Sequence, residues 1–134
     1  MIVVDANILI YSLIKCDQSP LIQKLRGKDA DWRTTALCRH ETLNVLATYL
    51  RRGVLTLAQS RALLGHAERF IEVAQCEVAM DAALAVAAEY AITGYDAQYV
   101  ALAQSLNTPL ITEDRRLRIT VPGIAFSIQE FLAQ

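Results

Sequence analysis

Four carboxylates stand where acidic side chains could share one site. Asp5 directly follows the apolar run Ile2–Val4, and Asp114 lies two residues after a second run, Leu110–Thr112. Each acid then falls at the carboxyl end of a predicted strand, the edge at which open α/β sheets bind ligands. Taken singly, each is more simply explained as a loop or helix-cap residue. If the two strands are neighbours, we expect both carboxylates in one crevice.

Asp96 and Glu41 lie on predicted helices. Asp96 shares a helix face with Val100 and Ala103, so we expect it to point inward, although a helix N-terminus by itself also stabilises an anion. Glu41 heads a polar stripe and, taken alone, is typical of a surface residue. Such an all-oxygen set suits a hard cation, Mg²⁺ or Mn²⁺, whereas zinc normally takes His or Cys.

The elements that must position these acids alternate between strand and helix patterns. Short apolar runs predict strands at 2–4, 32–35, 76–79, 109–112 and 124–126. Helices are predicted between them, with Asn7, Thr56 and Asp81 as caps, at 7–15, 19–27, 38–52, 56–73, 81–94, 96–106 and after 126. This alternation implies right-handed crossovers and a mainly parallel sheet covered on both faces. The predicted fold class is α/β, as a single domain over residues 1–134.

The predicted helix 38–52 has two apolar stripes. The spacing of Leu43, Leu46, Ala47 and Leu50 predicts the face that packs on the core. The second stripe either packs beneath the helix 56–73 or forms a groove for a partner; it consists of Cys38, Thr42, Val45 and Tyr49.

Composition limits the class of protein further. At 134 residues and 54% hydrophobic content, the chain can bury a substantial core. A net charge of −1 argues against a broad basic groove, so a polyanion must be gripped locally, and Arg115 and Arg116 lie in one of two arginine clusters. Three scattered cysteines, no leader and no apolar run long enough for a bilayer lead us to expect a soluble, cytoplasmic protein with no membrane contact.

Four segments of the chain, taken together, resemble a known family. V-D-A-N-I-L-I-Y, R-H-E-T-L-N-V-L, Y-D-A-Q-Y-V-A-L-A and L-I-T-E-D-R-R-L are similar to the motifs of PIN-domain ribonucleases, and among these to VapC-type toxins. The likeness covers nearly the whole chain in order. It implies a three-layer α/β/α sandwich on a short parallel sheet, and acids that bind divalent metal and cleave RNA.

The resemblance also implies a role for each residue. By motif position, the catalytic acids fall on Asp5, Glu41, Asp96 and Asp114. As a hypothesis, Asp5, Asp96 and Asp114 hold Mg²⁺ or Mn²⁺, and Glu41 orients or deprotonates the attacking water. Asn7 and Thr112 are expected to support the first and last acids. Arg115 or Arg116 is expected to contact the RNA strand.

The resemblance leaves two features of the site open and implies a protein partner. The number of metal ions stays open, as does the role of Glu113, the acid beside Asp114. VapC-type toxins imply a homodimer neutralised by a small cognate antitoxin protein, which makes this chain the expected toxin of a type II toxin–antitoxin pair.

Other classes remain as alternatives. A catalytically idle module with the same fold is one, and a phosphoryl-transfer or receiver-type domain, which also places acids at strand ends, is another. The second class uses a late lysine, yet every lysine here lies before residue 30. Cys38 and His40, two positions apart on a helix, project to different faces and cannot act as a pair. G-x-S-x-G and G-x-x-x-x-G-K-[ST] motifs are absent.

Overall fold

The computed structural model describes all of residues 1–134, built around a five-stranded sheet. The sheet order is β3-β2-β1-β4-β5 and every neighbouring pair is parallel. The strands are β1 Ile2–Val4, β2 Trp32–Thr35, β3 Gln75–Cys76, β4 Leu110–Ile111 and β5 Ala125–Phe126. The α/β class is therefore confirmed, and the sheet expected to be mainly parallel is parallel throughout.

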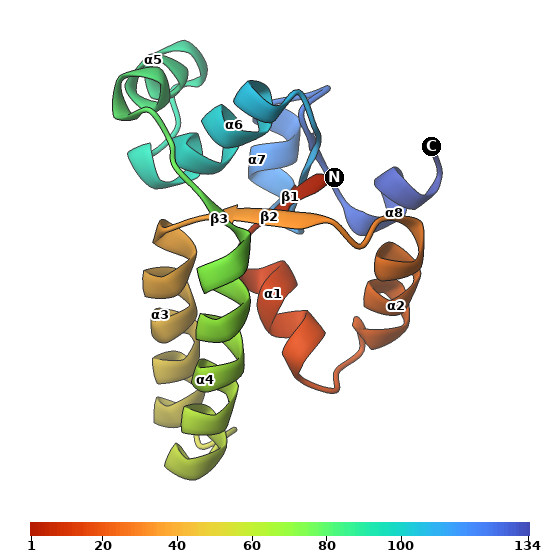
Figure 1. The fold of residues 1–134 in the computed structure, drawn as a ribbon, viewed down its shortest axis with the longest axis vertical. Helices are drawn as coiled ribbons and strands as arrows, with labels where there is room; N and C mark the ends of the chain where they lie inside the picture. The colour runs from red at the N-terminus through yellow and green to blue at the C-terminus, as the bar shows by residue number, and fades with distance from the viewer.

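Helices cover both faces of the sheet, so the molecule has three layers (Figure 1). One layer contains α1 Ala6–Leu13, α2 Ser19–Lys28, α3 Leu37–Arg51 and α4 Leu57–Ala74. The other contains α5 Met80–Tyr90, α6 Gly94–Leu106 and α7 Arg115–Thr120, while the C-terminal α8 Ile128–Leu132 packs against α2. No helix is both long enough and apolar enough to cross a membrane.

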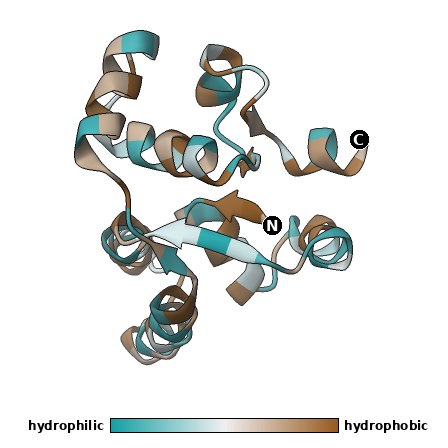
Figure 2. Ribbon diagram, turned by 45° about the horizontal axis from the view of Figure 1, so that its top comes forward, coloured by the Kyte–Doolittle hydropathy of each residue, from teal (hydrophilic) through white to brown (hydrophobic).

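The central strand β1 is buried on both sides. Ile2 and Val4 face a cluster with residues of α1, α2 and α8, whereas Val3 faces the cluster that contains most of the α6 core residues. Alternate residues of a strand point to opposite faces, which explains this division. Figure 2 shows β1 strongly hydrophobic between the two helical layers.

The order of the strands determines where their ends meet. From β1 the chain passes to β2 and β3 on one side, then returns to place β4 on the other side of β1. Val3 pairs with Leu110 and Val4 with Ile111, so β1 and β4 end at the same edge. This reversal of strand order opens a crevice beyond the carboxyl ends of β1 and β4, the usual ligand position in such sheets.

Several predicted boundaries were wrong in detail. The cap of α1 is Asp5, not Asn7, and α5 begins at Met80 without a side-chain cap, so Asp81 lies inside its first turn. The strand predicted at 76–79 is the shorter Gln75–Cys76. The helix α7 was not predicted, because six residues are too few to show a helical period.

The predicted core face of α3 was partly wrong. Leu43 is 55% exposed, whereas Cys38 and Thr42 of the second stripe are fully buried. The extensive packing of α3 against α4 and α1 covers this second stripe in part. A partner groove along the full stripe is therefore excluded, because its first two residues already belong to the interior.

Candidate functional site

Asp5 is held by the end of one strand and the start of one helix. It follows β1 directly, and its Oδ1 caps α1 by accepting the backbone N–H of Ile8 at 3.1 Å. Its Oδ2 accepts the hydroxyl of Thr112 at 2.6 Å. Thr112 is fully buried and lies immediately after β4, so this bond joins the ends of the two central strands.

Asp114 is positioned by the same threonine. Its backbone N–H donates to Thr112 Oγ1 at 3.1 Å, and its own Oδ1 caps α7 by accepting the N–H of Leu117 at 3.1 Å. Asp5 and Asp114 are thus both helix caps and both directed by Thr112. Each carboxylate accepts a backbone N–H of the helix that it caps, and this hydrogen bond holds the carboxylate at the crevice between β1 and β4.

Asp96 comes from the opposite layer. It is the third residue of α6, a helix that begins two residues earlier than predicted and is capped by Thr93. The Thr93 Oγ1 accepts the backbone N–H of Asp96 at 3.1 Å and so fixes the first turn of α6. The carboxylate is half-buried, as its position on an inward helix face predicted.

Glu41 approaches from α3 and meets Tyr99 of α6. The Tyr99 hydroxyl donates to Glu41 Oε1 at 2.6 Å, although Tyr99 itself is 2% exposed. Tyr99 was not among the residues predicted for the site. The missed signal is that Tyr99 lies three residues after Asp96, on the same side of α6, and has a polar tip that must find a partner when buried.

Burial and neighbouring charges raise the pKa of three of the acids, Asp5, Glu41 and Asp96. Burial is the main cause that raises the pKa of Asp5 to about 6, with smaller contributions from the charges of Glu41 and Asp114 and opposed by its hydrogen bonds. Burial also raises the pKa of Glu41, to which the charge of Asp96 adds. The pKa of Asp96 is raised by burial and then by Asp114. The four carboxylates therefore form one electrostatically coupled group.

No basic side chain neutralises this group. The ion pairs of the chain lie elsewhere and join Met1 to Asp29, Arg33 to Asp31, Arg39 to Glu68 and Arg118 to Glu130. Three of these carboxylates, those of Asp5, Glu41 and Asp96, are partly buried, and a buried carboxylate without a cation is costly because it loses hydration with no compensating charge. This arrangement creates a strong local demand for positive charge.

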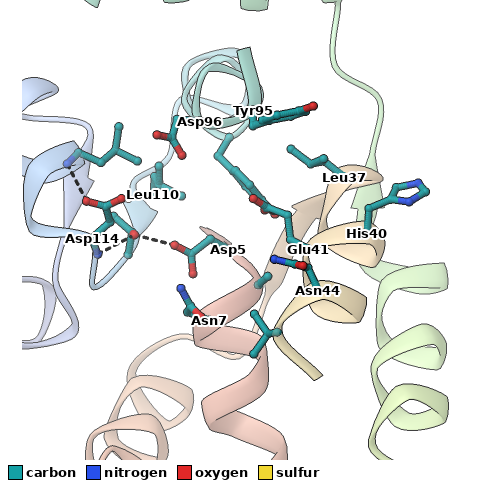
Figure 3. A pocket seen from close by; sticks show the side chains of 15 residues that line it. Asp5, Asn7, Leu37, His40, Glu41, Asn44, Tyr95, Asp96, Leu110 and Asp114 are labelled. Atoms are coloured by element: carbon teal, nitrogen blue, oxygen red, sulfur yellow. Dashed lines mark hydrogen bonds between the residues drawn. The ribbon is translucent and has the colours of Figure 1, made fainter. Parts of the chain in front are cut away.

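All four acids line one pocket of about 520 Å³ (Figure 3). Its donors are mainly carboxylate oxygens, with the hydroxyl of Thr112 and the amides of Asn7 and Asn44, which suits a hard divalent cation in chemical type. However, no three acidic, His or Cys side chains are grouped closely enough to surround one ion. The residues fit such a cation in chemistry and charge, while the carboxylates are distributed around the pocket.

The other residues expected at the site lie in different positions. Asn7 is exposed and lines the pocket. Arg115 and Arg116 are exposed at the start of α7, outside the pocket lining. Glu113 turns away, since its Oε1 accepts the backbone N–H of Ile128 at 2.9 Å and so anchors α8.

Comparisons with known proteins agree with this architecture. The family model described as "PIN domain" matches residues 2–121. The chain is 29% identical over 127 residues to Ribonuclease VapC3 of Pyrobaculum aerophilum, covering 92% of this chain and 96% of the relative. It also resembles the crystal structure of PAE2754 from Pyrobaculum aerophilum, with a TM-score of 0.76, 26% identity and coverage of 98% of this chain and 93% of that one. The chain belongs to the PIN domain family.

Proposed function

We propose that this protein is a divalent-metal-dependent ribonuclease that hydrolyses RNA phosphodiester bonds. The observation that supports this most directly is the coupled group of four carboxylates in one pocket with no basic partner. A cation supplied from solution is the simplest way to stabilise that group. Membership of the PIN domain family and similarity to Ribonuclease VapC3 support RNA as the substrate.

Asp5, Asp96 and Asp114 would hold the cation, Mg²⁺ or Mn²⁺, once their carboxylates, which are spread around the pocket in the metal-free structure, draw together on it. When bound, the cation supplies positive charge to the phosphoryl oxygens and lowers the pKa of a bound water. Glu41 orients the attacking water and accepts its proton. The water oxygen bonds to phosphorus as the bond to O3′ breaks, which leaves a 5′-phosphate and, after O3′ takes a proton from solvent, a 3′-hydroxyl.

Neighbouring residues support this chemistry. Thr112 fixes the Asp5 carboxylate through its hydroxyl, and Asn7 presents an amide at the pocket wall. Arg115 and Arg116, exposed next to Asp114, contact the phosphates that flank the scissile bond. The cationic contacts are thereby kept beside the pocket rather than in it, where they would compete with the metal.

We further propose that the protein acts in the cytoplasm as the homodimeric toxin of a type II pair, neutralised by a cognate antitoxin protein. The similarity to Ribonuclease VapC3 supports this. A gene for a small DNA-binding protein adjoining the coding sequence, growth arrest on expression of this chain alone, and a dimer in light scattering are the expected results. If expression of this chain alone does not slow growth and the purified protein is a monomer, both the toxin role and the homodimer are contradicted.

One experiment tests the enzymatic proposal. A mixed RNA pool is incubated with the protein and Mn²⁺, and we expect cleavage that EDTA abolishes. Asp96→Asn is nearly isosteric and should abolish cleavage with an unchanged circular dichroism spectrum, whereas the exposed Asp17→Asn should cleave as wild type does. Absence of cleavage by well-folded wild type across RNA pools and both metals would favour the catalytically idle module.

A further inference from the structure

The carboxylates are only part of the pocket lining. Figure 3 shows Asp114 on one side, and Tyr95, Leu37 and His40 along the other, with Asp5 between them. This second part of the lining comes from the first turns of α3 and α6, next to Glu41 and Asp96 in the chain. It combines an aromatic ring, a half-buried aliphatic side chain and an exposed imidazole. We call these three residues the aromatic wall.

Tyr95 is the feature of this wall that the fold does not use. It lies next to Asp96 and is 65% exposed, whereas Tyr99, one turn later on the same helix, is 2% exposed. The two tyrosines therefore have different environments. Tyr99 packs in the core, and the ring of Tyr95 is left at the pocket with most of its surface available for contact.

We propose that the aromatic wall is a nucleobase site, in which the Tyr95 ring stacks on the base of an unpaired nucleotide beside the scissile phosphate. This inference rests on the proposed ribonuclease function and assigns Tyr95 a base contact at the same site. A base is joined through its sugar to the adjoining phosphate. A phosphate placed among the acids therefore brings its flanking base to the neighbouring wall.

Charge explains why such a contact is useful here. Four carboxylates line the pocket, so the metal-free pocket repels an RNA backbone, and the net charge of −1 over the whole chain offers no broad basic surface to offset this. Stacking on an aromatic ring requires no charge, and it tolerates every base because each presents a flat π-face. The wall thus supplies binding that the carboxylates of the pocket cannot supply.

The same geometry discriminates against duplex RNA. Bases in an A-form helix are stacked on their neighbours, and only loops, bulges and single strands present bases that are free to stack on protein. We therefore expect this protein to bind and cleave single strands or loops in preference to perfect duplexes.

The first test measures binding without chemistry or backbone charge. The probe is a fluorescein-labelled, single-stranded methylphosphonate oligonucleotide, whose neutral linkages cannot be hydrolysed at this site, and fluorescence anisotropy gives its Kd. Tyr95→Ala should weaken binding about tenfold, and Tyr95→Phe, which keeps the ring, should restore most of it. Leu84→Ala removes an exposed apolar side chain of α5 away from the pocket and serves as control.

The second test measures cleavage of a short single-stranded RNA with Mn²⁺. The loss in Tyr95→Ala should appear as an increase of KM of similar size. Replacing the base beside the cleaved bond by an abasic site should reproduce that loss in wild type and add nothing in Tyr95→Ala.

Each outcome decides one proposal. Equal Kd values for wild type and Tyr95→Ala, or losses from the variant and the abasic site that multiply, would overturn the nucleobase site. If the oligonucleotide binds in a Tyr95-dependent manner but no RNA is cleaved, the ribonuclease proposal fails while the base contact stands. If RNA is cleaved with EDTA sensitivity and Tyr95 has no effect, only the nucleobase site fails.

Discussion

The hydroxyl of Tyr99 donates a hydrogen bond to Glu41 Oε1 at 2.6 Å and so links helices from the two opposite layers of the fold. The bond passes beyond the carboxyl end of the sheet, beside the pocket lined by both residues. Because Tyr99 is almost fully buried, its ring cannot move without disturbing the core. The bond therefore holds one oxygen of Glu41 in a fixed direction.

The Tyr99→Phe variant tests this positioning. Phenylalanine fills the same space, so the fold should be kept while Glu41 loses a hydrogen bond that lowers its pKa. We expect kcat to fall about tenfold, the effect of about 1.4 kcal/mol, with KM little changed. The acidic limb of the pH–kcat profile should also move to higher pH, because the pKa of the Glu41 carboxyl rises.

Tyr90→Phe is the matched control, since Tyr90 is half-buried on α5 and does not line the pocket. It should leave both kcat and the pH profile as in wild type. A Tyr99→Phe variant whose loss lies wholly in thermal stability, with an unshifted pH profile, would show that Tyr99 is only a packing residue.

The hydroxyl of Thr112 should contribute strongly to stability. Thr112→Val keeps the shape but removes the donor to Asp5 and the acceptor for the backbone N–H of Asp114. We expect a loss of about 2 kcal/mol in the free energy of unfolding, since polar groups at the pocket lose partners. Chemical denaturation at neutral pH measures the change.

The chain offers a matched threonine for comparison. Thr35 is fully buried at the end of β2, and its Oγ1 has no hydrogen-bond partner. Thr35→Val should therefore be neutral or stabilising by about 1 kcal/mol. Equal losses at positions 35 and 112 would show that methyl packing, rather than the hydroxyl of Thr112, determines the effect.

Much of this fold could be predicted from local patterns. The run Ile2–Val4 followed by Asp5 indicated a buried strand with an acid at its end. Thr56 indicated the N-cap of α4, where the structure has a capping box. Asp5 and Asp114 also show why the cap and site interpretations were hard to separate, because each carboxylate caps a helix with one oxygen.

Other features depend on long-range packing that spacing cannot reveal. Both stripes of α3 are apolar, and only the positions of α1 and α4 decide that Cys38 is buried while Leu43 is exposed. The bond between Tyr99 and Glu41 joins residues 58 positions apart. The direction of Glu113 likewise depends on α8, which comes later in the chain.

Divalent metal should stabilise the folded protein. On the proposed metal site, Mn²⁺ would bind the native carboxylates more tightly than the unfolded chain, so the melting temperature at pH 7.5 should rise with Mn²⁺ concentration. At a hundredfold excess over Kd, the free energy of unfolding should increase by about 2.7 kcal/mol. Asp96→Asn should remove most of this shift, whereas the exposed Asp17→Asn should retain it. A wild-type protein whose melting is insensitive to both Mn²⁺ and Mg²⁺ would contradict the metal assignment.

The raised pKa of Asp5 makes the metal-free protein sensitive to pH in a defined direction. The ordinary pKa of an aspartate is 3.8 and that of Asp5 in the fold is about 6, so the folded state binds the proton more tightly than the unfolded chain does. The favourable contribution is complete below pH 3.8 and is lost as pH rises through about 6. In EDTA, the free energy of unfolding of wild type should therefore fall by about 3 kcal/mol relative to Asp5→Asn between these limits.

Asp31→Asn is a control of opposite sign, because Arg33 lowers the pKa of exposed Asp31 and its contribution is lost as pH falls. The prediction is contradicted if the free energy of unfolding of wild type, minus that of Asp5→Asn, is constant or increases with pH. Burial would then not disfavour the charged form of Asp5, and a cation would not be needed to stabilise that residue.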